Sequence, residues 1–200
     1  DEDKDNNPLY LPIKNKAYLG NDTNEVTGFN ISSDYDMIAY TKNNLWLISR
    51  REVLDGLYDY VYTETRSDNG HDCVGQTIIT PLNEYPLQLN HKGFFVYQAI
   101  QNVLTSDKTS VLISNNINAK LLKTPNLQNA FFINHLYWTL MFVPDENKTR
   151  VFVLDDRDST WYYWEFNEKL VSVVNIGDEI ELTNEDGRHF TLETSDIINE

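Results

Sequence analysis

The stretch HLYWTLMFVPDENKTRVFVLDDRDSTWYYWEF, His135 to Phe166, decides the fold of this chain. Its first part, Leu136 to Val143, is apolar on both faces except at Thr139, and this pattern predicts a strand that is buried on both sides. A polar turn, PDENK, follows at residues 144–148, and its proline ends the strand because proline cannot donate to a β ladder. We therefore expect the first strand of an antiparallel meander here.

Two more strands follow in the same stretch. Arg150 to Leu154 is β-branched and aromatic, and a second polar turn separates it from Thr160 to Phe166. The last segment alternates, which places Trp161 on one face of the sheet and Trp164 on the other. Of the chain's 25 aromatic residues, 11 lie within residues 131–166. A meander this aromatic must be packed on both faces by neighbouring sheets.

The same pattern of short strands and polar turns extends over most of the chain. Residues 36–50, DMIAYTKNNLWLISR, predict a hairpin with its turn at residues 42–44, because Asn-Asn tolerates the positive φ of a tight turn. In residues 57–65, LYDYVYTET, every second residue from Tyr58 to Tyr62 is a tyrosine, which predicts a strand with one tyrosine face.

Further strands are predicted at residues 25–31, 77–80, 93–99, 110–114, 130–134, 170–174, 178–182 and 188–192. The only helix expected is short, from Asn116 to Lys123, opened by an asparagine cap and closed before Pro125. The fold class is therefore all-β.

Composition limits the partners. The 200 residues carry 16 basic and 31 acidic side chains, a net charge of −15. A surface that grips nucleic acid or an anionic membrane needs the opposite sign, whereas an acidic surface suits a polyanion that must pass without sticking. A single cysteine excludes an internal disulfide framework, and no apolar run approaches the length of a membrane anchor.

Three regions are expected along the chain. Residues 1–8 form a disordered acidic leader, because they contain little to bury. Residues 9–75 form an N-terminal β region that ends in a loop at 67–75, and residues 76–200 form propeller-like β blades. Two hundred residues are few for a propeller and an attachment region. We therefore expect either a segment of a larger protein or blades that another chain completes.

A repeated phrase, a polar turn followed by an aromatic strand, supports the propeller-like architecture of four-stranded antiparallel blades. It occurs as KNNLWLIS (42–49), HKGFFVYQ (91–98), INHLYWTLMF (133–142) and EDGRHFTL (185–192). The steps of 49, 42 and 53 residues separate Trp46, Phe95, Tyr137 and Phe190. These steps are close to the size of a four-stranded propeller blade. A β-sandwich remains the alternative, because its hairpins also give turn signals at short intervals.

The turn Asp156-Arg157-Asp158-Ser159-Thr160-Trp161 resembles the second half of the Asp-box of sialidase-type propellers. In that motif an aspartate bonds turn amides while the tryptophan packs between neighbouring blades. Here Leu154 stands where the motif has Ser or Thr, and Asp158 stands where it has Gly. The likeness supports a blade hairpin and does not support a sialidase.

Longer phrases resemble a family of virion proteins. VFVLDDRDSTWYYWEF (151–166) and TNEDGRHFTLET (183–194) are similar to the propeller-type tail proteins of short-tailed bacteriophages, the tail nozzle or tubular proteins, called the muzzle in crAss-like phages. Residues 81–117, with HKGFFVYQAIQNVLTSDKTSVLISNNI, resemble another blade of these proteins, with Gly93 before the strand. The resemblance covers Pro81 to Thr194.

The resemblance implies a structural protein of the virion. Identical subunits would form a homo-oligomeric ring at the distal tail, next to other tail, adaptor and fibre proteins, as a conduit for DNA ejection without specific DNA binding. It implies no enzyme activity and no catalytic, cofactor or metal residues. A chain of net charge −15 repeated around a channel would repel phosphates, which predicts that the acidic residues cluster on one lumenal surface.

Two other function classes stay open. The first is a carbohydrate-binding or glycoside-cleaving β-propeller, in which exposed rings such as Trp161 stack on sugar and a pair of carboxylates acts as acid and base. Its candidates are Asp155, Asp156 and Asp158 with Glu165, although aspartates around an arginine in a turn are usually solvated. The second is a non-viral acidic interaction scaffold that holds a partner by its tyrosine-rich surface.

The loop SDNGHDCVG (67–75) contains His71, Asp72 and Cys73, residue types that bind metals or act as nucleophiles. A tetrahedral metal site needs more ligands, and His91, His135 and His189 each stand without ligand spacing. A cysteine nucleophile also needs a base that sequence cannot place. We expect an exposed loop here, with no metal site.

Overall fold

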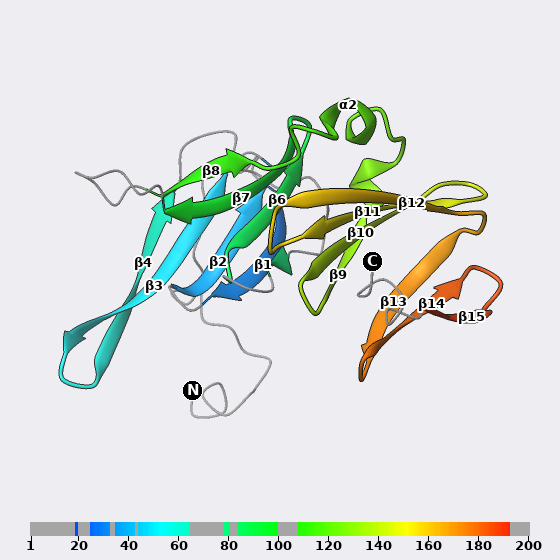
Figure 1. The fold of residues 1–200 in the computed structure, drawn as a ribbon. Helices are drawn as coiled ribbons and strands as arrows, with labels where there is room; N and C mark the ends of the chain where they lie inside the picture. The colour runs from blue at the N-terminus through cyan, green and yellow to red at the C-terminus, as the bar shows by residue number, and fades with distance from the viewer. Residues whose placement is uncertain are drawn as a thin grey trace.

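Antiparallel strands are the dominant element of the structure, which contains very little helix (Figure 1). The computed structural model describes residues 19, 25–32, 35–42, 44–64, 78–80, 84–99 and 108–192. The leader at 1–8 and the loop at 67–75 lie outside these residues, so the predictions made for them stay predictions.

The strands form four sheets in chain order. The first sheet contains β1 (Val26–Ser32), β2 (Tyr35–Thr41), β3 (Leu45–Leu54) and β4 (Leu57–Glu64). The second contains β5 (Ile78–Ile79), β6 (Pro86–Asn90), β7 (Gly93–Ala99) and β8 (Lys108–Leu112). The third contains β9 (Phe131–His135), β10 (Trp138–Pro144), β11 (Thr149–Asp155) and β12 (Thr160–Phe166). The fourth contains β13 (Leu170–Ile176), β14 (Glu179–Asn184) and β15 (His189–Leu192). Two short helical segments, α2 (Asn118–Leu121) and η2 (Leu127–Asn129), connect the second and third sheets.

The meander predicted from residues 135–166 is confirmed. Strands β10, β11 and β12 pair antiparallel in chain order, and β9 adds a fourth strand beside β10. All residues of β10 except its last, Pro144, are buried, as the apolar pattern predicted. Leu136 was expected to start this strand but lies in the β9–β10 turn with φ 53° and a half-exposed side chain.

The second and third sheets pack face to face. Phe94 of β7 stacks with Phe132 of β9, with ring centroids 6.0 Å apart. The same Phe94 ring meets Trp161 of β12 edge to face at 5.6 Å. Phe152 of β11 is fully buried in this layer and contacts the Tyr163 ring at 5.3 Å. Aromatic side chains from β7, β9, β11 and β12 therefore fill the space between these two sheets.

The opposite face of the third sheet packs on the fourth. On this face of the third sheet, Leu140, Phe142 and Val151 are buried. They pack against Ile180 and Leu182 of β14. The first sheet packs on the second in the same way, with buried residues of β2 and β3 against Tyr97 of β7. The sheets thus form a stack of four layers, and the first strands of successive sheets touch, β1 with β5, β5 with β9 and β9 with β13.

The all-β prediction is confirmed, and the sheets are antiparallel as predicted. The four strands predicted for each sheet are present in the first three sheets, whereas the described part of the fourth has three. The described residues close into neither a barrel nor a complete propeller. The alternative, a β-sandwich, has two packed sheets, whereas the described residues form four layers.

The repeat predicted from sequence was misaligned in one sheet. Trp46, Phe95 and Phe190 each lie on the third strand of a sheet, β3, β7 and β15. Tyr137 lies instead in the β9–β10 turn. The equivalent position in the third sheet is on β11, where Phe152 is the buried aromatic residue. The error arose because two neighbouring hairpins of this sheet both contain a polar turn and an aromatic strand.

The helix prediction needs a correction as well. Helix α2 is only four residues long and has no side-chain cap at its N-terminus. Asn118 instead accepts a hydrogen bond from Ser114 Oγ to its Oδ1 (2.6 Å) and donates from Nδ2 to the Lys92 carbonyl (3.0 Å). Phe94 N donates to Ser114 Oγ at 2.8 Å, so this buried junction joins the α2 segment to the start of β7.

Gly93 is fixed by the same junction. Its φ is +138°, and a Cβ built on it would lie 2.6 Å from Asn118 Oδ1, 2.7 Å from Leu112 Cδ1 and 2.7 Å from Ser114 Oγ. Only glycine fits such a close approach at this φ.

Gly93→Ala should therefore destabilise the protein by roughly 3 kcal/mol or more, from backbone strain and overpacking together. Gly56→Ala is the matched control, because Gly56 has φ +74° but nothing within 4 Å of its Cβ position. That variant should lose only about 1 kcal/mol. Urea unfolding of both variants measures the difference, and equal losses would show that the close packing at Gly93 is unimportant.

Candidate interaction surface

The carboxylates proposed as a glycosidase pair lie at opposite ends of the third sheet. Asp155 pairs with Thr160 at one end of the β11–β12 ladder, and Glu165 pairs with Arg150 at the other. Five residues of extended strand place the two backbone positions about 17 Å apart along the ladder. Retaining and inverting glycosidases need separations of about 5 to 9.5 Å. Asp156 and Asp158 lie in the turn beside Asp155, so they do not shorten this distance appreciably.

The tryptophans proposed as a sugar platform pack inside the stack. Trp161 contacts the core between the second and third sheets and donates from Nε1 to the Ile113 carbonyl at 2.9 Å. Trp164 packs on the other side, between the third and fourth sheets. The prediction that the two rings lie on opposite faces is confirmed, and both are half-buried. They do not form one open aromatic face.

The side chain of Asp155 holds the β11–β12 turn together by hydrogen bonds. The Asp-box likeness indicated this role for the next residue, Asp156. Asp155 is buried, and its Oδ1 accepts hydrogen bonds from Arg157 N (3.0 Å) and Nε (2.9 Å). Its Oδ2 accepts from Arg157 Nη2 (2.6 Å) and Trp138 Nε1 (3.1 Å). The hydrogen bonds from the Arg157 side chain lower the pKa of Asp155 to about 2, against the opposing effect of burial. A carboxylate held ionised by an arginine is a structural pair and a poor proton donor near neutral pH.

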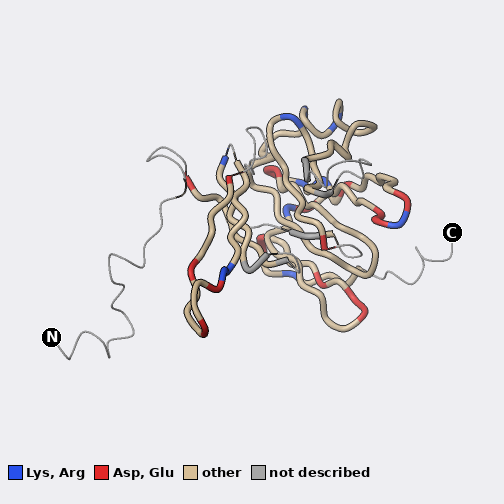
Figure 2. Tube along the Cα trace, turned by 90° about the vertical axis from the view of Figure 1, so that its left-hand side faces the viewer, with Lys and Arg blue, Asp and Glu red and all other residues tan. Residues whose placement is uncertain are grey.

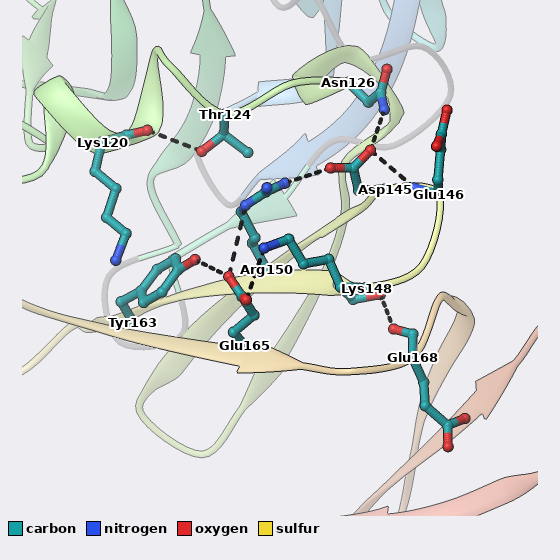
Figure 3. A network of polar contacts seen from close by, with 11 residues as sticks. Lys120, Thr124, Asn126, Asp145, Glu146, Lys148, Arg150, Tyr163, Glu165 and Glu168 are labelled. Atoms are coloured by element: carbon teal, nitrogen blue, oxygen red, sulfur yellow. Dashed lines mark hydrogen bonds and ion pairs between the residues drawn. The ribbon is translucent and has the colours of Figure 1, made fainter.

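A second polar network, which the sequence did not reveal, surrounds Arg150 at the other end of the sheet (Figure 3). Arg150 Nη1 donates to Asp145 Oδ2 at 3.0 Å, and its Nε lies 3.9 Å from Glu165 Oε2. Glu165 also accepts from Lys148 Nζ (2.9 Å) and Tyr163 Oη (2.8 Å). These two hydrogen bonds, with Lys148 contributing most, lower the pKa of Glu165.

The network also attaches the segment between the second and third sheets. Lys120 Nζ lies 3.0 Å from the centroid of the Tyr163 ring, and Asn126 Nδ2 donates to Asp145 Oδ1 at 3.2 Å. Burial, and then the hydrogen bond to Glu165, raise the pKa of Tyr163. The carboxylate is held charged and the phenol is held neutral, so neither is adjusted for proton transfer near pH 7. The network compensates charge and fixes the α2 segment on the sheet.

Metal ligands do not gather in the part of the chain that the structure describes: no three His, Cys, Asp or Glu side chains there could hold an ion. The loop with His71, Asp72 and Cys73 falls outside that part. Within the same residues, no helix has the length and hydropathy to cross a membrane.

The acidic residues are spread over several separate parts of the described chain (Figure 2). In the third sheet, the turn with Asp145 and Glu146 and the turn with Asp156 lie at opposite ends of β11. In the fourth sheet, Asp178 and Asp186 lie in turns at opposite ends of β14. The predicted lumenal cluster is therefore not present in this part of the molecule.

The most exposed large feature is the β3–β4 hairpin, which projects from the first sheet (Figure 1). Strand β2 pairs with β3 only as far as Met37 opposite Ile48, and beyond that point the hairpin has two strands. We call residues 49–64 the arm. Every residue from Arg50 to Glu64 is exposed. The hairpin predicted within residues 36–50 did not include this extension: β3 continues to Leu54.

The predicted tyrosine face is confirmed as one side of the arm. Tyr58, Tyr60 and Tyr62 pair with Glu52, Arg50 and Ile48, so all three rings lie on one face. They are 47%, 51% and 42% exposed. The Arg50 guanidinium lies 4.5 Å from the Tyr58 ring centroid, a cation–π contact within the arm. The other face also carries apolar side chains, Val61 and the tip residues Val53, Leu54 and Leu57 being among the exposed large hydrophobic residues.

The tyrosine face continues onto the outer face of the first sheet. Ile48, opposite Tyr62, packs with Trp46 and Ala39 in a small cluster that includes Leu19. Farther along, Phe29, Met37 and Ile31 are 58%, 40% and 71% exposed. Exposed apolar side chains that share one face are typical of surfaces on which proteins interact.

No family model matches this chain, and no curated protein and no solved structure is significantly similar to it.

Stability below pH 4 should depend on Asp155. Its folded pKa is depressed to about 2 from an ordinary 3.8, so its contribution is complete above pH 4 and is lost as the pH falls towards 2. Asp155→Asn should lose roughly 2 kcal/mol at pH 7 and show a shallower decline of stability between pH 4 and 2. Urea unfolding across this range measures both effects.

Asp158→Asn is the control for this experiment, because Asp158 lies in the same turn but is exposed and can accept the Thr160 amide as an asparagine. A parallel decline of wild type and Asp155→Asn with falling pH would contradict the role given to Asp155.

Proposed function

We propose that this chain is a non-enzymatic structural module of a homo-oligomeric ring, of the phage tail nozzle type that its sequence resembles. The observation that carries the proposal is the incomplete stack of sheets. Each internal face of the stack is closed by another sheet. The outer face of the first sheet is buried at its centre, at Ala39, Trp46 and Ile48, but exposes Phe29, Ile31 and Met37 beside it. Such a face is suited to a neighbouring subunit or a further blade.

A propeller-type arrangement is part of the proposal. Each described sheet is a meander in chain order, and its first strand touches the first strand of the next sheet. Blades of a propeller are arranged in this way, with their first strands around the axis. Four sheets without closure correspond to an arc, which further residues or another chain would complete.

The proposal rests on the packing of the sheets and not on the distribution of acidic charge. Because the described acidic side chains occupy turns at both ends of the sheets, electrostatic repulsion of DNA is not an argument for the ring. The glycosidase alternative loses the residues proposed for it: Asp155 and Glu165 lie at opposite ends of the β11–β12 ladder, and Trp161 and Trp164 pack on opposite faces of the third sheet.

Negative-stain or cryo-electron microscopy of the purified chain, with mass photometry, tests the ring. We expect closed particles of one defined symmetry. Phe29→Glu should shift them to smaller species because it places charge on the outer face of the first sheet, whereas Val174→Glu on the fourth sheet serves as a control at a similarly exposed strand residue. A strictly monomeric wild-type chain at all concentrations, also when added to phage tails, would overturn the proposal.

A further inference from the structure

We infer that β4 is a self-pairing edge, through which two copies of this chain join antiparallel to make one continuous sheet. In the described residues, β4 pairs with β3 on one side and with no strand on the other. All eight of its residues are exposed, so its outer edge is open to a partner. The occupant we assign to this edge is the β4 strand of a second copy.

The edge carries one charged side chain that opposes pairing, Asp59, but lacks the other features that usually prevent it. Edge strands are commonly protected by proline, lysine, a bulge or a very short length. Strand β4 reads LYDYVYTE, without proline or lysine, and it pairs in register with β3 from Tyr58 to Glu64. A two-stranded ribbon is also marginally stable by itself in water. Widening the arm to four strands would therefore stabilise it.

The backbone is oriented for the pairing. Tyr60 N donates to the Asp59 side chain, Oδ1, at 2.8 Å, which places this amide on the outer edge of β4. Amides alternate in direction along a strand, so those of Tyr58 and Tyr62 face the same edge. Two β4 strands centred on Tyr60 would exchange backbone hydrogen bonds at these three positions once the Asp59 carboxylates swing away.

The sequence YDYVY is symmetric in its aromatic residues, and this symmetry selects a second copy as the partner. With Tyr60 opposite Tyr60 of the other copy, each Tyr58 lies opposite Tyr62, and six tyrosines line one face. Asp59 then lies opposite Val61, and within its own copy it stays opposite Arg51 of β3. Centring the pair on Asp59 instead would put two carboxylates opposite each other, which is destabilising.

This contact is isologous, with the same patch on both copies, and it is separate from the ring. A single cyclic ring contains no such two-fold axis, so in a ring assembly β4 pairing would join two rings. A ring in which β4 stays unpaired would leave the proposed function intact and overturn this inference, and a dimer without a ring would do the reverse.

Cysteine cross-linking of the full chain tests the register. In a Cys73→Ser background, Tyr60→Cys should give a disulfide-linked dimer on mild oxidation, because directly opposite residues have Cα atoms about 5.5 Å apart. Tyr58→Cys alone should run as a monomer on a non-reducing gel, since the two residues 58 of a dimer would lie about 14 Å apart along the strands. A mixture of Tyr58→Cys and Tyr62→Cys chains should cross-link again. Preferential cross-linking of Val61→Cys over Tyr60→Cys would overturn the tyrosine register.

Sedimentation of uncross-linked variants tests the affinity. Tyr60→Lys should abolish the dimer by placing two ammonium groups on the two-fold axis, with an unchanged thermal melting profile as evidence that the exposed substitution leaves the fold intact. Asp59→Ala should tighten the dimer by roughly fivefold or more, because no side chain then competes for the Tyr60 amide. A wild-type chain that is monomeric at about 100 μM, with no cross-link from Tyr60→Cys, would show that β4 is left open or covered by another protein, and the inference would fail.

Discussion

Burial of the third sheet on both of its faces is the constraint on which the rest of the structure depends. Strand β10 has almost no polar side chain to offer to solvent, so a layer must cover each side of it. The second sheet covers one face and the fourth covers the other, in two separate hydrophobic clusters. At about 2 kcal/mol for each fully buried large apolar side chain, these two clusters supply most of the stabilisation that the described residues contain.

Polar groups then set how the layers are joined. The Asp155–Arg157 pair closes one end of the third sheet and fixes Trp138, while the Arg150 network closes the other end. The Ser114–Asn118 junction fixes the α2 segment against β7. Each of these groups sits where the chain leaves one strand or sheet for the next. Hydrophobic packing thus determines which faces meet, and hydrogen bonds determine where the connections run.

Much of this architecture followed from local patterns. The alternation in residues 160–166 and the turns at 42–44 and 144–148 were enough to predict β12 and two hairpins, because side-chain periodicity and turn chemistry are local properties. Strand β6, PLQLN, was not predicted: it begins with proline and contains Gln88 and Asn90, and it is a strand because the surrounding sheets bury it completely. The Arg150 network was missed for a similar reason, since its members come from three separate segments that only the fold brings together.

The two ends of the stack are chemically different. On the fourth sheet, β14 alternates buried Ile180 and Leu182 with the solvent-facing Glu179 and Glu181, as an antiparallel sheet does when one face meets water. Its neighbour β13 leaves Val174 and Ile176 exposed on the same outer face. The outer face of the first sheet instead exposes aromatic rings, those of Phe29 and of the tyrosines of the arm. Aromatic side chains are enriched at protein interfaces. Contacts with other subunits should therefore concentrate on the first sheet, both across its outer face and along the edge of β4.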